Sequence, residues 1–235
     1  MTFELWSKMP CSWQTEANFH GKLMHSAPIG LLGGCLPPGE AIAALKLYVA
    51  LCLKANFKAG SYLPATGCVQ KSISQLCELV GLSRPMTIKG LRKLQEWEII
   101  TVKGGRPAIY HITDYETAKY WTKLPQTHLY AGSNGKCIEP LRDMSNRTKT
   151  TLHALQMYLY LAAIRDKKTH LAKVTYDHMT KVLGITRNDI SKAISILISS
   201  NLISVRLAGP DEFFGERPSN IYWLRGTQVE GRGSE

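Results

Sequence analysis

Apolar residues recur at helical spacing in three segments of the first half of the chain. A first helix is predicted from Glu40, with an apolar stripe made of Leu45, Tyr48, Val49, Cys52 and Leu53. A second is predicted from Ser72 to Gly81, because glycine suits the left-handed conformation that commonly ends a helix. Ser83 is expected to cap a third helix, whose first turn tolerates Pro85. The pattern therefore predicts three helices in close succession.

Alternating apolar and polar residues follow the third helix and are typical of strands. Ile99 to Lys103 and Ala108 to Thr113 alternate on either side of Gly104-Gly105-Arg106-Pro107, which predicts a tight basic hairpin. Residues 57–70, between the first two helices, are rich in glycine and proline and are expected to form a loop. Helix, helix, turn, helix, strand, hairpin and strand is the order of a winged helix.

The second half of the chain repeats this pattern. Gly81-Leu82-Ser83-Arg84 returns as Gly184-Ile185-Thr186-Arg187, 103 positions later, and Lys89 returns as Lys192 at the same shift. Insertions have collected between the elements and not inside them, which is typical of a true internal repeat. Two further segments return at shifts of 110 and 111: Ala44-Leu45 as Ala154-Leu155, and Arg106-Pro107 as Arg217-Pro218.

The repeat predicts an α+β fold, mainly α, with two tandem winged-helix (helix-turn-helix) domains. In the second copy the expected elements are the helices Thr151–Arg165, Tyr176–Leu183 and Arg187–Ser200 and the strands Ile203–Leu207 and Asn220–Leu224. Asn201 occupies a position that calls for a positive φ, which asparagine tolerates. The expected organisation is an amino-terminal arm (1–39), domain 1 (40–114), a linker (115–147), domain 2 (148–225) and a disordered tail (226–235).

The chain is strongly basic, with 29 lysine and arginine residues against 18 acidic residues and a net charge of +11. Such an excess favours a polyanionic partner, nucleic acid ahead of an anionic membrane surface. The amino terminus lacks the pattern of a signal peptide, and no apolar run approaches the ~20 residues that span a bilayer. We therefore expect a cytoplasmic protein without a membrane partner.

Residue types that support catalysis or metal binding are scattered. The six cysteines form no CxxC pair and have no histidine partner at zinc-ligand spacing, so we expect no metal. Cys52 and Cys77 are expected to be buried as small hydrophobic residues. A phosphate-binding loop motif is absent, and Tyr110 and Tyr222 occupy the same strand of each copy, where packing explains them. We expect no enzymatic activity, no catalytic residue and no cofactor.

The third helix of a helix-turn-helix enters the major groove, so its exposed side chains are the candidate DNA contacts. Thr87, Leu91 and Leu94 are expected to face inward in the first copy, and Gly90 to allow a close approach to the preceding helix. The candidate contacts are Arg84, Met86, Lys89, Arg92 and Lys93 in the first copy and Arg187, Asn188, Ser191 and Lys192 in the second.

Arginine binds guanine and asparagine binds adenine through paired hydrogen bonds, so Arg84, Arg187 and Asn188 are the candidate base-reading residues. The lysines and Arg92 are expected to hold phosphates. Arg106 in the first wing, and its equivalent Arg217 in the second, are further candidates. The second wing also contains Asp211, Glu212 and Glu216, which make it a poorer DNA contact.

The segments from Leu82-Ser83-Arg84 to Ile99-Ile100 and from Ile185-Thr186-Arg187 to Leu202-Ile203 resemble the winged-helix signature of many bacterial regulators and phage replication proteins. Two such units in a basic chain of this length resemble the plasmid replication initiator (Rep) proteins over roughly residues 40–225. The resemblance implies a plasmid or mobile-element initiator that binds origin repeats in double-stranded DNA, with host replication proteins as partners.

Three other interpretations use the same fold. A transcriptional regulator would bind DNA as a symmetric dimer on a palindrome, whereas a tandem protein binds an asymmetric site as a monomer. A subunit of a larger nucleoprotein complex would use one winged helix for DNA and the other for its neighbours. A protein-binding scaffold, like the tandem winged-helix subunits of chromosome-condensing complexes, is disfavoured by the charge of +11. Monomer and homodimer both remain open.

Overall fold

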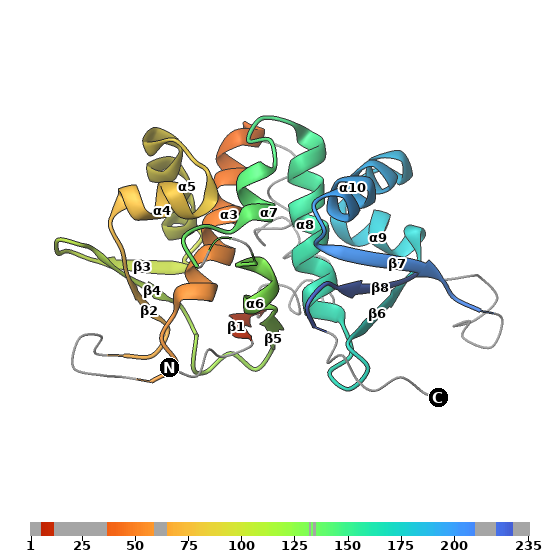
Figure 1. Ribbon diagram of the computed structural model, residues 1–235, viewed down its shortest axis with the longest axis horizontal. Coiled ribbons are helices and arrows are strands. Elements are labelled where there is room, and N and C mark those ends of the chain that lie inside the picture. The colour runs from red at the N-terminus through yellow and green to blue at the C-terminus, as the bar shows by residue number, and fades with distance from the viewer. Residues whose placement is uncertain are drawn as a thin grey trace.

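A computed structural model describes residues 6–11, 37–58, 65–131, 133, 135–209 and 220–227, which form a mixed α/β fold (Figure 1). These residues build helices α3 to α10 and strands β1 to β8, and the strands form three small antiparallel sheets. None of the helices in these ranges has both the length and the apolar character needed to cross a membrane.

Two stretches of the chain have the same order of elements. The N-terminal unit consists of α3 (Pro38–Lys54), β2 (Cys68–Gln70), α4 (Ile73–Val80), α5 (Arg84–Glu96), β3 (Ile100–Lys103) and β4 (Ile109–Ile112). The C-terminal unit consists of α8 (Lys149–Ile164), β6 (Leu171–Val174), α9 (Tyr176–Leu183), α10 (Arg187–Ser199), β7 (Ile203–Leu207) and β8 (Asn220–Leu224). Their sheets have the strand orders β2-β4-β3 and β6-β8-β7, so the central strand is the last one of each unit.

The ends of the helices follow the expected local chemistry. The Ser72 hydroxyl accepts a hydrogen bond from the Gln75 amide at 3.2 Å, and the Gln75 side chain accepts one from the Ser72 amide at 3.0 Å, so a capping box starts α4. Gly81 ends this helix at a φ of 68°, and Gly184 ends α9 at 67°. Ser83 stands at the start of α5, but its side chain makes no capping hydrogen bond, which corrects the expectation from the sequence.

The predicted loop at residues 57–70 is wrong at its end, where Cys68–Gln70 forms a strand. This strand pairs with β4, with Val69 opposite Tyr110, and its counterpart β6 pairs with β8. Each is only three or four residues long, and its partner lies about forty residues later for β2 and about fifty residues later for β6. Local alternation is too short to predict such an edge strand, since long-range pairing stabilises it.

The first helix of each unit is buried on all sides. Every residue from Ala41 to Leu53 in α3 is buried, which corrects the single apolar stripe expected from the sequence. The two helices lie side by side in the middle of the molecule, with α4 and α5 beyond α3 and with α9 and α10 beyond α8 (Figure 1). A single hydrophobic core therefore runs through both units.

A close contact between helices depends on Gly90 in α5. A Cβ atom placed there would lie 2.8 Å from Leu47 Cδ1 and 2.9 Å from the carbonyl carbon of Ala43, both in α3. The close approach expected at Gly90 therefore exists, but its partner is the first helix of the unit and not the preceding helix α4. The expected inward residues Thr87, Leu91 and Leu94 are all buried.

Residues 115–147, which we expected to act as a linker, contain β5 (Trp121–Leu124), α6 (Gln126–Leu129) and α7 (Glu139–Asp143). Strand β5 pairs with β1 (Ser7–Pro10) from the expected arm, and the Tyr48 hydroxyl of α3 donates to the Pro10 carbonyl at 2.6 Å. This joining segment contacts both units: the Ile138 amide donates to the Leu79 carbonyl of α4 at 2.8 Å, and His128 Nε2 lies 2.7 Å from the Asn201 carbonyl oxygen. Most of the expected arm and residues 228–235 of the expected tail lie outside the described residues.

Candidate nucleic-acid interface

Helices α5 and α10 occupy the same end of the molecule, on either side of the central pair α3 and α8 (Figure 1). The loop between α7 and α8 lies at this end too. Its Asn146 carbonyl oxygen would be 3.1 Å from a Cβ atom on Gly39, in the first turn of α3. The end of the molecule that carries both third helices also carries Arg147 and Lys149, which are exposed.

Most of the candidate side chains of α5 are exposed. Arg84, Lys89 and Arg92 are exposed, together with Ile88, which is 40% exposed. Met86 is half-buried and packs against the core, which corrects its assignment to the exposed face. The side chain of Lys93 is only 21% exposed and pairs with Glu96 at 2.5 Å. The accessible basic residues of this helix are therefore Arg84, Lys89 and Arg92.

The basic residues of α5 differ in whether an acidic side chain forms an ion pair with them. Lys89 Nζ lies 2.9 Å from the Glu40 carboxylate in the first turn of α3. Arg84 begins α5 with no carboxylate within ion-pairing distance among the described residues. The Arg84 guanidinium is therefore available to an external anion or base edge.

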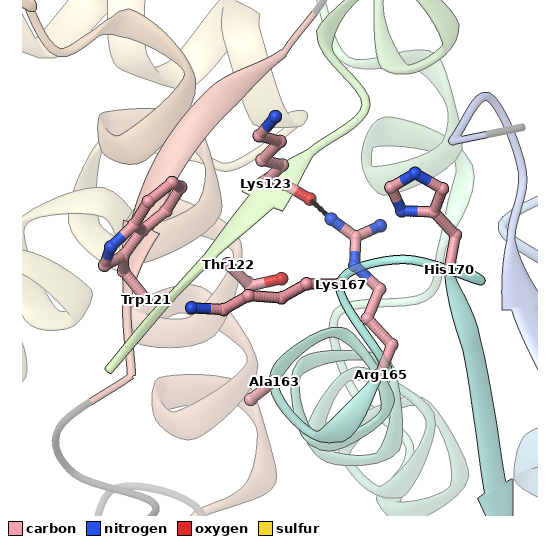
Figure 2. A pocket seen from close by; sticks show the side chains of 7 residues that line it. All are labelled: Trp121, Thr122, Lys123, Ala163, Arg165, Lys167 and His170. Carbon is pink, nitrogen blue, oxygen red and sulfur yellow. Dashed lines mark hydrogen bonds between the residues drawn. The ribbon is translucent and has the colours of Figure 1, made fainter. Parts of the chain in front are cut away.

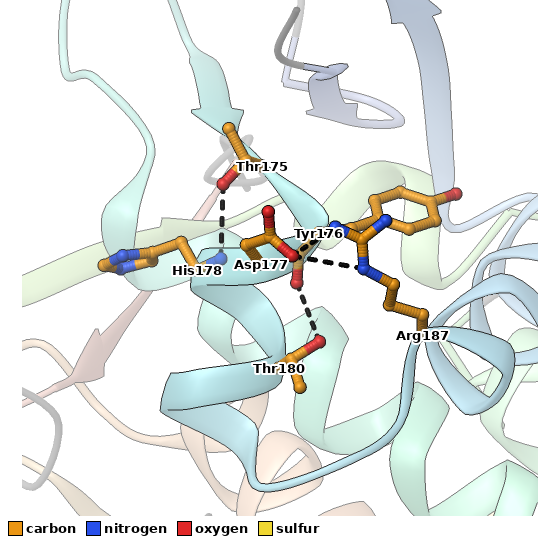
Figure 3. A network of polar contacts seen from close by, with 6 residues as sticks. All are labelled: Thr175, Tyr176, Asp177, His178, Thr180 and Arg187. Carbon is orange, nitrogen blue, oxygen red and sulfur yellow. Dashed lines mark hydrogen bonds and ion pairs between the residues drawn. The ribbon is translucent and has the colours of Figure 1, made fainter. Parts of the chain in front are cut away.

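The exposed face of α10 is more polar and less basic. Arg187, Asn188, Ser191 and Lys192 are all exposed, as the sequence predicts. Arg187 forms an ion pair with Asp177 in the first turn of α9, in which Nε lies 3.1 Å from Oδ1 (Figure 3). Asp189, which the sequence reasoning did not use, accepts a hydrogen bond from the Thr186 hydroxyl at 2.8 Å and lies at the start of this helix.

The two units hold different cations because the acidic residues sit at different places in the repeat. The position of Asp177 is occupied by Ser74 in the N-terminal unit, so Arg84 lacks the partner that Arg187 has. The position of Glu40 is occupied by Thr150 in the C-terminal unit, and Lys192 has no ion pair within the described ranges. Within the described ranges, Arg84 and Arg92 of α5 and Lys192 of α10 therefore have no ion pair.

The turn between β3 and β4 forms one wall of a groove. Arg106 is exposed in this turn, and a groove of about 530 Å³ separates it from the start of α4, with Lys71 on the other side. Sequence reasoning missed Lys71, Arg147 and Lys149. Their position just before a predicted helix was the only available signal. Arg217 and residues 210–219 of the expected second wing lie outside the described residues.

Side chains that could bind a metal ion do not form a cluster in the described ranges. No group of three histidine, cysteine or acidic side chains gathers there at a distance suited to a metal ion. Tyr110 and Tyr222 are buried in equivalent central strands, and burial raises the pKa of both phenols above the usual value. Both hydroxyls are therefore neutral near pH 7, and both side chains pack in the core.

The expected burial of Cys77 is wrong, because this residue of α4 is only half-buried.

Comparison with known proteins gives no assignment of function: no protein-family model matches the chain, and no curated protein matches it in sequence. The candidate interface therefore rests on the placement, exposure and pairing of its own side chains.

Proposed function

We propose that the chain is a double-stranded DNA-binding protein built from two tandem winged helices. The observation that supports this best is that α5 and α10 lie at one end of the molecule and present Arg84, Arg92, Asn188 and Lys192 to solvent. A B-DNA major groove, about 12 Å wide, accommodates one helix. In this proposal α5 and α10 enter successive major grooves on the same side of the duplex.

Different side chains would have different tasks at this surface. Arg84 and Asn188, in the first turns of α5 and α10, are placed as base-reading residues, because the first turns of a recognition helix approach the base edges. Lys89, Arg92 and Lys192 would bind phosphates and set the affinity without selecting a sequence. Lys71 and Arg106 would contact the backbone beside the first helix.

Within this class we favour a plasmid or mobile-element replication initiator that binds origin repeats. The shared core of α3 and α8 fixes the two units relative to each other, which suits an asymmetric or directly repeated site bound by one molecule. A transcriptional regulator would use the same surface on a palindrome. The alternative of a subunit in a larger nucleoprotein complex would use only one of the two helices for DNA.

Selection from a pool of random duplexes at about 0.15 M salt, followed by sequencing, tests the proposal. We expect an asymmetric or directly repeated motif about two helical turns long. Arg84→Ala should weaken binding to the selected site by about 10- to 100-fold, as expected for one base-reading arginine. Lys168→Ala is the matched control, since Lys168 is exposed in the turn after α8, away from α5 and α10.

A palindromic motif would favour a dimeric regulator. Absence of any enriched motif, with binding that disappears as salt rises, would overturn sequence recognition and reduce the surface to non-specific phosphate contact.

A further inference from the structure

A second basic site lies at the opposite end of α8 from the α7–α8 loop. Here β5 and the turn that follows α8 enclose a cavity of about 230 Å³ (Figure 2). Its lining combines an aromatic and aliphatic wall with four basic side chains: Trp121, Thr122, Lys123, Ala163, Arg165, Lys167 and His170. None of the described residues that line it is acidic.

Arg165 is a buried cation without an acidic partner. Its side chain is almost fully enclosed, with the residue only 8% exposed. The Nη2 group donates a hydrogen bond to the carbonyl oxygen of Lys123, while Nη1 is buried and has no hydrogen-bond partner among the described residues. Proteins seldom bury a guanidinium without a carboxylate or another anion beside it, because desolvation of the charge is costly.

The neighbouring carboxylate does not fill this role. Asp166 is exposed, and its carboxylate accepts hydrogen bonds from the backbone amides of Lys168 and Thr169 and from the Thr169 hydroxyl. No ion pair in the described part of the chain includes Arg165. The Arg165 guanidinium is therefore available to form an ion pair with an anion that enters the cavity.

The repeat shows that the fold itself does not require an arginine at this place. Arg165 follows the last residue of α8 in an extended conformation, and Ala55 follows α3 in the same way. The hydrogen bond from Arg165 to Lys123 does join α8 to β5, and so does the hydrogen bond from the Thr122 hydroxyl to Ala162 at 2.7 Å. One neutral contact already serves this joining role, so it does not explain a buried charge.

His170 adds a second unpaired polar atom in the same cavity. Its Nδ1 is buried without a hydrogen-bond partner in the described residues, and its backbone has a φ of 59°, a left-handed conformation uncommon for a residue with a side chain. Burial and the nearby Arg165 charge lower the pKa of His170, so the ring is neutral near pH 7. A neutral imidazole with its proton on Nδ1 donates a hydrogen bond to an anion.

We propose that this cavity binds the phosphate group of a nucleotide or of a DNA strand end, with Arg165 and His170 as the inner donors and Lys123 and Lys167 at the rim. Arginine and phosphate match in charge and in paired hydrogen-bond geometry. A water molecule takes about 30 Å³ in the liquid, so the cavity has room for a phosphate and part of the group that carries it. Trp121 and Ala163 provide an apolar wall for that group.

Calorimetric titration of the full chain with inorganic phosphate, at constant ionic strength against chloride, tests this site. We expect saturable binding of one phosphate per chain. Lys167→Ala should weaken it about tenfold through loss of one charge-assisted contact. Lys168→Ala, the neighbouring exposed lysine outside the cavity, should leave it unchanged. Arg165→Met should abolish phosphate binding. If Arg165→Met does not fold, the comparison of Lys167→Ala with Lys168→Ala still decides the test.

The source of the phosphate is separated by further titrations with adenosine 5′-monophosphate and with single-stranded oligonucleotides bearing a 5′-phosphate or a 5′-hydroxyl. Preference for the free nucleotide identifies a small-molecule site, and preference for the phosphorylated strand identifies a strand-end site. Equal loss in the Lys167 and Lys168 variants, or no saturable binding by the unaltered chain, would overturn the proposal. The duplex-binding experiment with Arg84→Ala does not involve this cavity, so the two proposals fail independently.

Discussion

The N-terminal and C-terminal units share their order of elements, yet their surroundings differ at the turn before the third helix. A Cβ atom on Gly81 would lie 2.8 Å from the Arg142 side chain of α7, whereas one on Gly184 would meet no described residue within 4 Å. The turn of the N-terminal unit is therefore backed by α7, and that of the C-terminal unit is open. The comparison teaches that two units can have the same order of helices and strands while the segment packed behind the turn and the ion pairs on the surface differ.

The backing of the N-terminal unit is anchored by a buried lysine. Lys46 of α3 donates hydrogen bonds to the Met144 carbonyl at 2.8 Å and to Asn146 Oδ1 at 2.6 Å. The Asn146 amide in turn donates to the Gly81 carbonyl at 3.0 Å. Gln156 of α8 occupies the equivalent position of the C-terminal unit. Substitution of Lys46 therefore tests directly whether this hydrogen-bonded lysine distinguishes the N-terminal unit from the C-terminal unit.

The largest expected effect is a pH dependence of stability that Lys46 confers. Burial lowers the pKa of Lys46 from 10.5 to about 8. Between about pH 8 and 10.5 the unfolded chain binds a proton at Lys46 that the folded chain has lost, so the free energy of unfolding rises with pH in this window. Relative to Lys46→Gln, the unaltered chain should gain up to about 3 kcal/mol from pH 8 to 10.5.

Urea unfolding at a series of pH values measures this gain. Lys168→Gln, which removes an exposed lysine and keeps Lys46, is the control and should change with pH as the unaltered chain does. A difference between the unaltered chain and Lys46→Gln that stays constant from pH 8 to 10.5 would show that burial does not lower the pKa of Lys46, contrary to the account.

A smaller effect is expected where α5 packs closely on α3. Gly90→Ala gains helix propensity of ~1 kcal/mol, but its Cβ would press on the backbone of Ala43, and such overpacking costs ~1–3 kcal/mol. We expect a net loss of up to about 2 kcal/mol in thermal or urea unfolding. The equivalent residue of α10 is Ala193, which is buried, so Ala193→Gly should also destabilise, by ~1 kcal/mol, through lost propensity and packing. A stabilised Gly90→Ala would contradict the close packing of α3 and α5.

The smallest effect concerns the acidic residue that holds Arg187. Exchange of the two equivalent residues should reverse the contrast between the third helices: Asp177→Ser frees Arg187 and tightens DNA binding, and Ser74→Asp engages Arg84 and weakens it. An exposed ion pair contributes about 0–1 kcal/mol, so each change should be at most about fivefold by fluorescence anisotropy. Glu78→Gln removes an exposed acid of α4 that forms no ion pair in the described ranges. The same gain in that control and in Asp177→Ser would assign the effect to net charge alone.

Local signals in the sequence were sufficient for the helices of the two units and for their hairpin strands, but not for α6 and α7 of the expected linker. Ser72 and Gly81 placed the ends of α4, and the internal repeat placed α9, β7 and β8 at their observed bounds. Strands β2 and β6 were missed because they are too short to show alternation. A signal was nevertheless present: the 103-residue shift of the repeat also relates Val69 to Ala172, which pair with the equivalent tyrosines Tyr110 and Tyr222.

The properties that the sequence did not reveal depend on contacts between distant segments. Burial of α3 on all sides follows from its packing against α8, more than a hundred residues later. The ion pairs of Lys89 and Arg187 depend on acidic residues in other helices. The sequence therefore predicted that these basic residues are exposed, but not whether an acidic side chain already occupies them. Arg165 also escaped notice, because only the three-dimensional arrangement shows a cation buried without a partner.

Protection of the selected duplex from chemical modification, compared between the unaltered chain, Arg84→Ala and Asn188→Ala, tests the central claim that two helices bind one DNA site. The account predicts two protected major-groove segments, of which Arg84→Ala loses the one bound by α5 and Asn188→Ala loses the one bound by α10. Loss of the same segment in both variants, or protection unchanged in either, would contradict the claim that α5 and α10 each contact DNA.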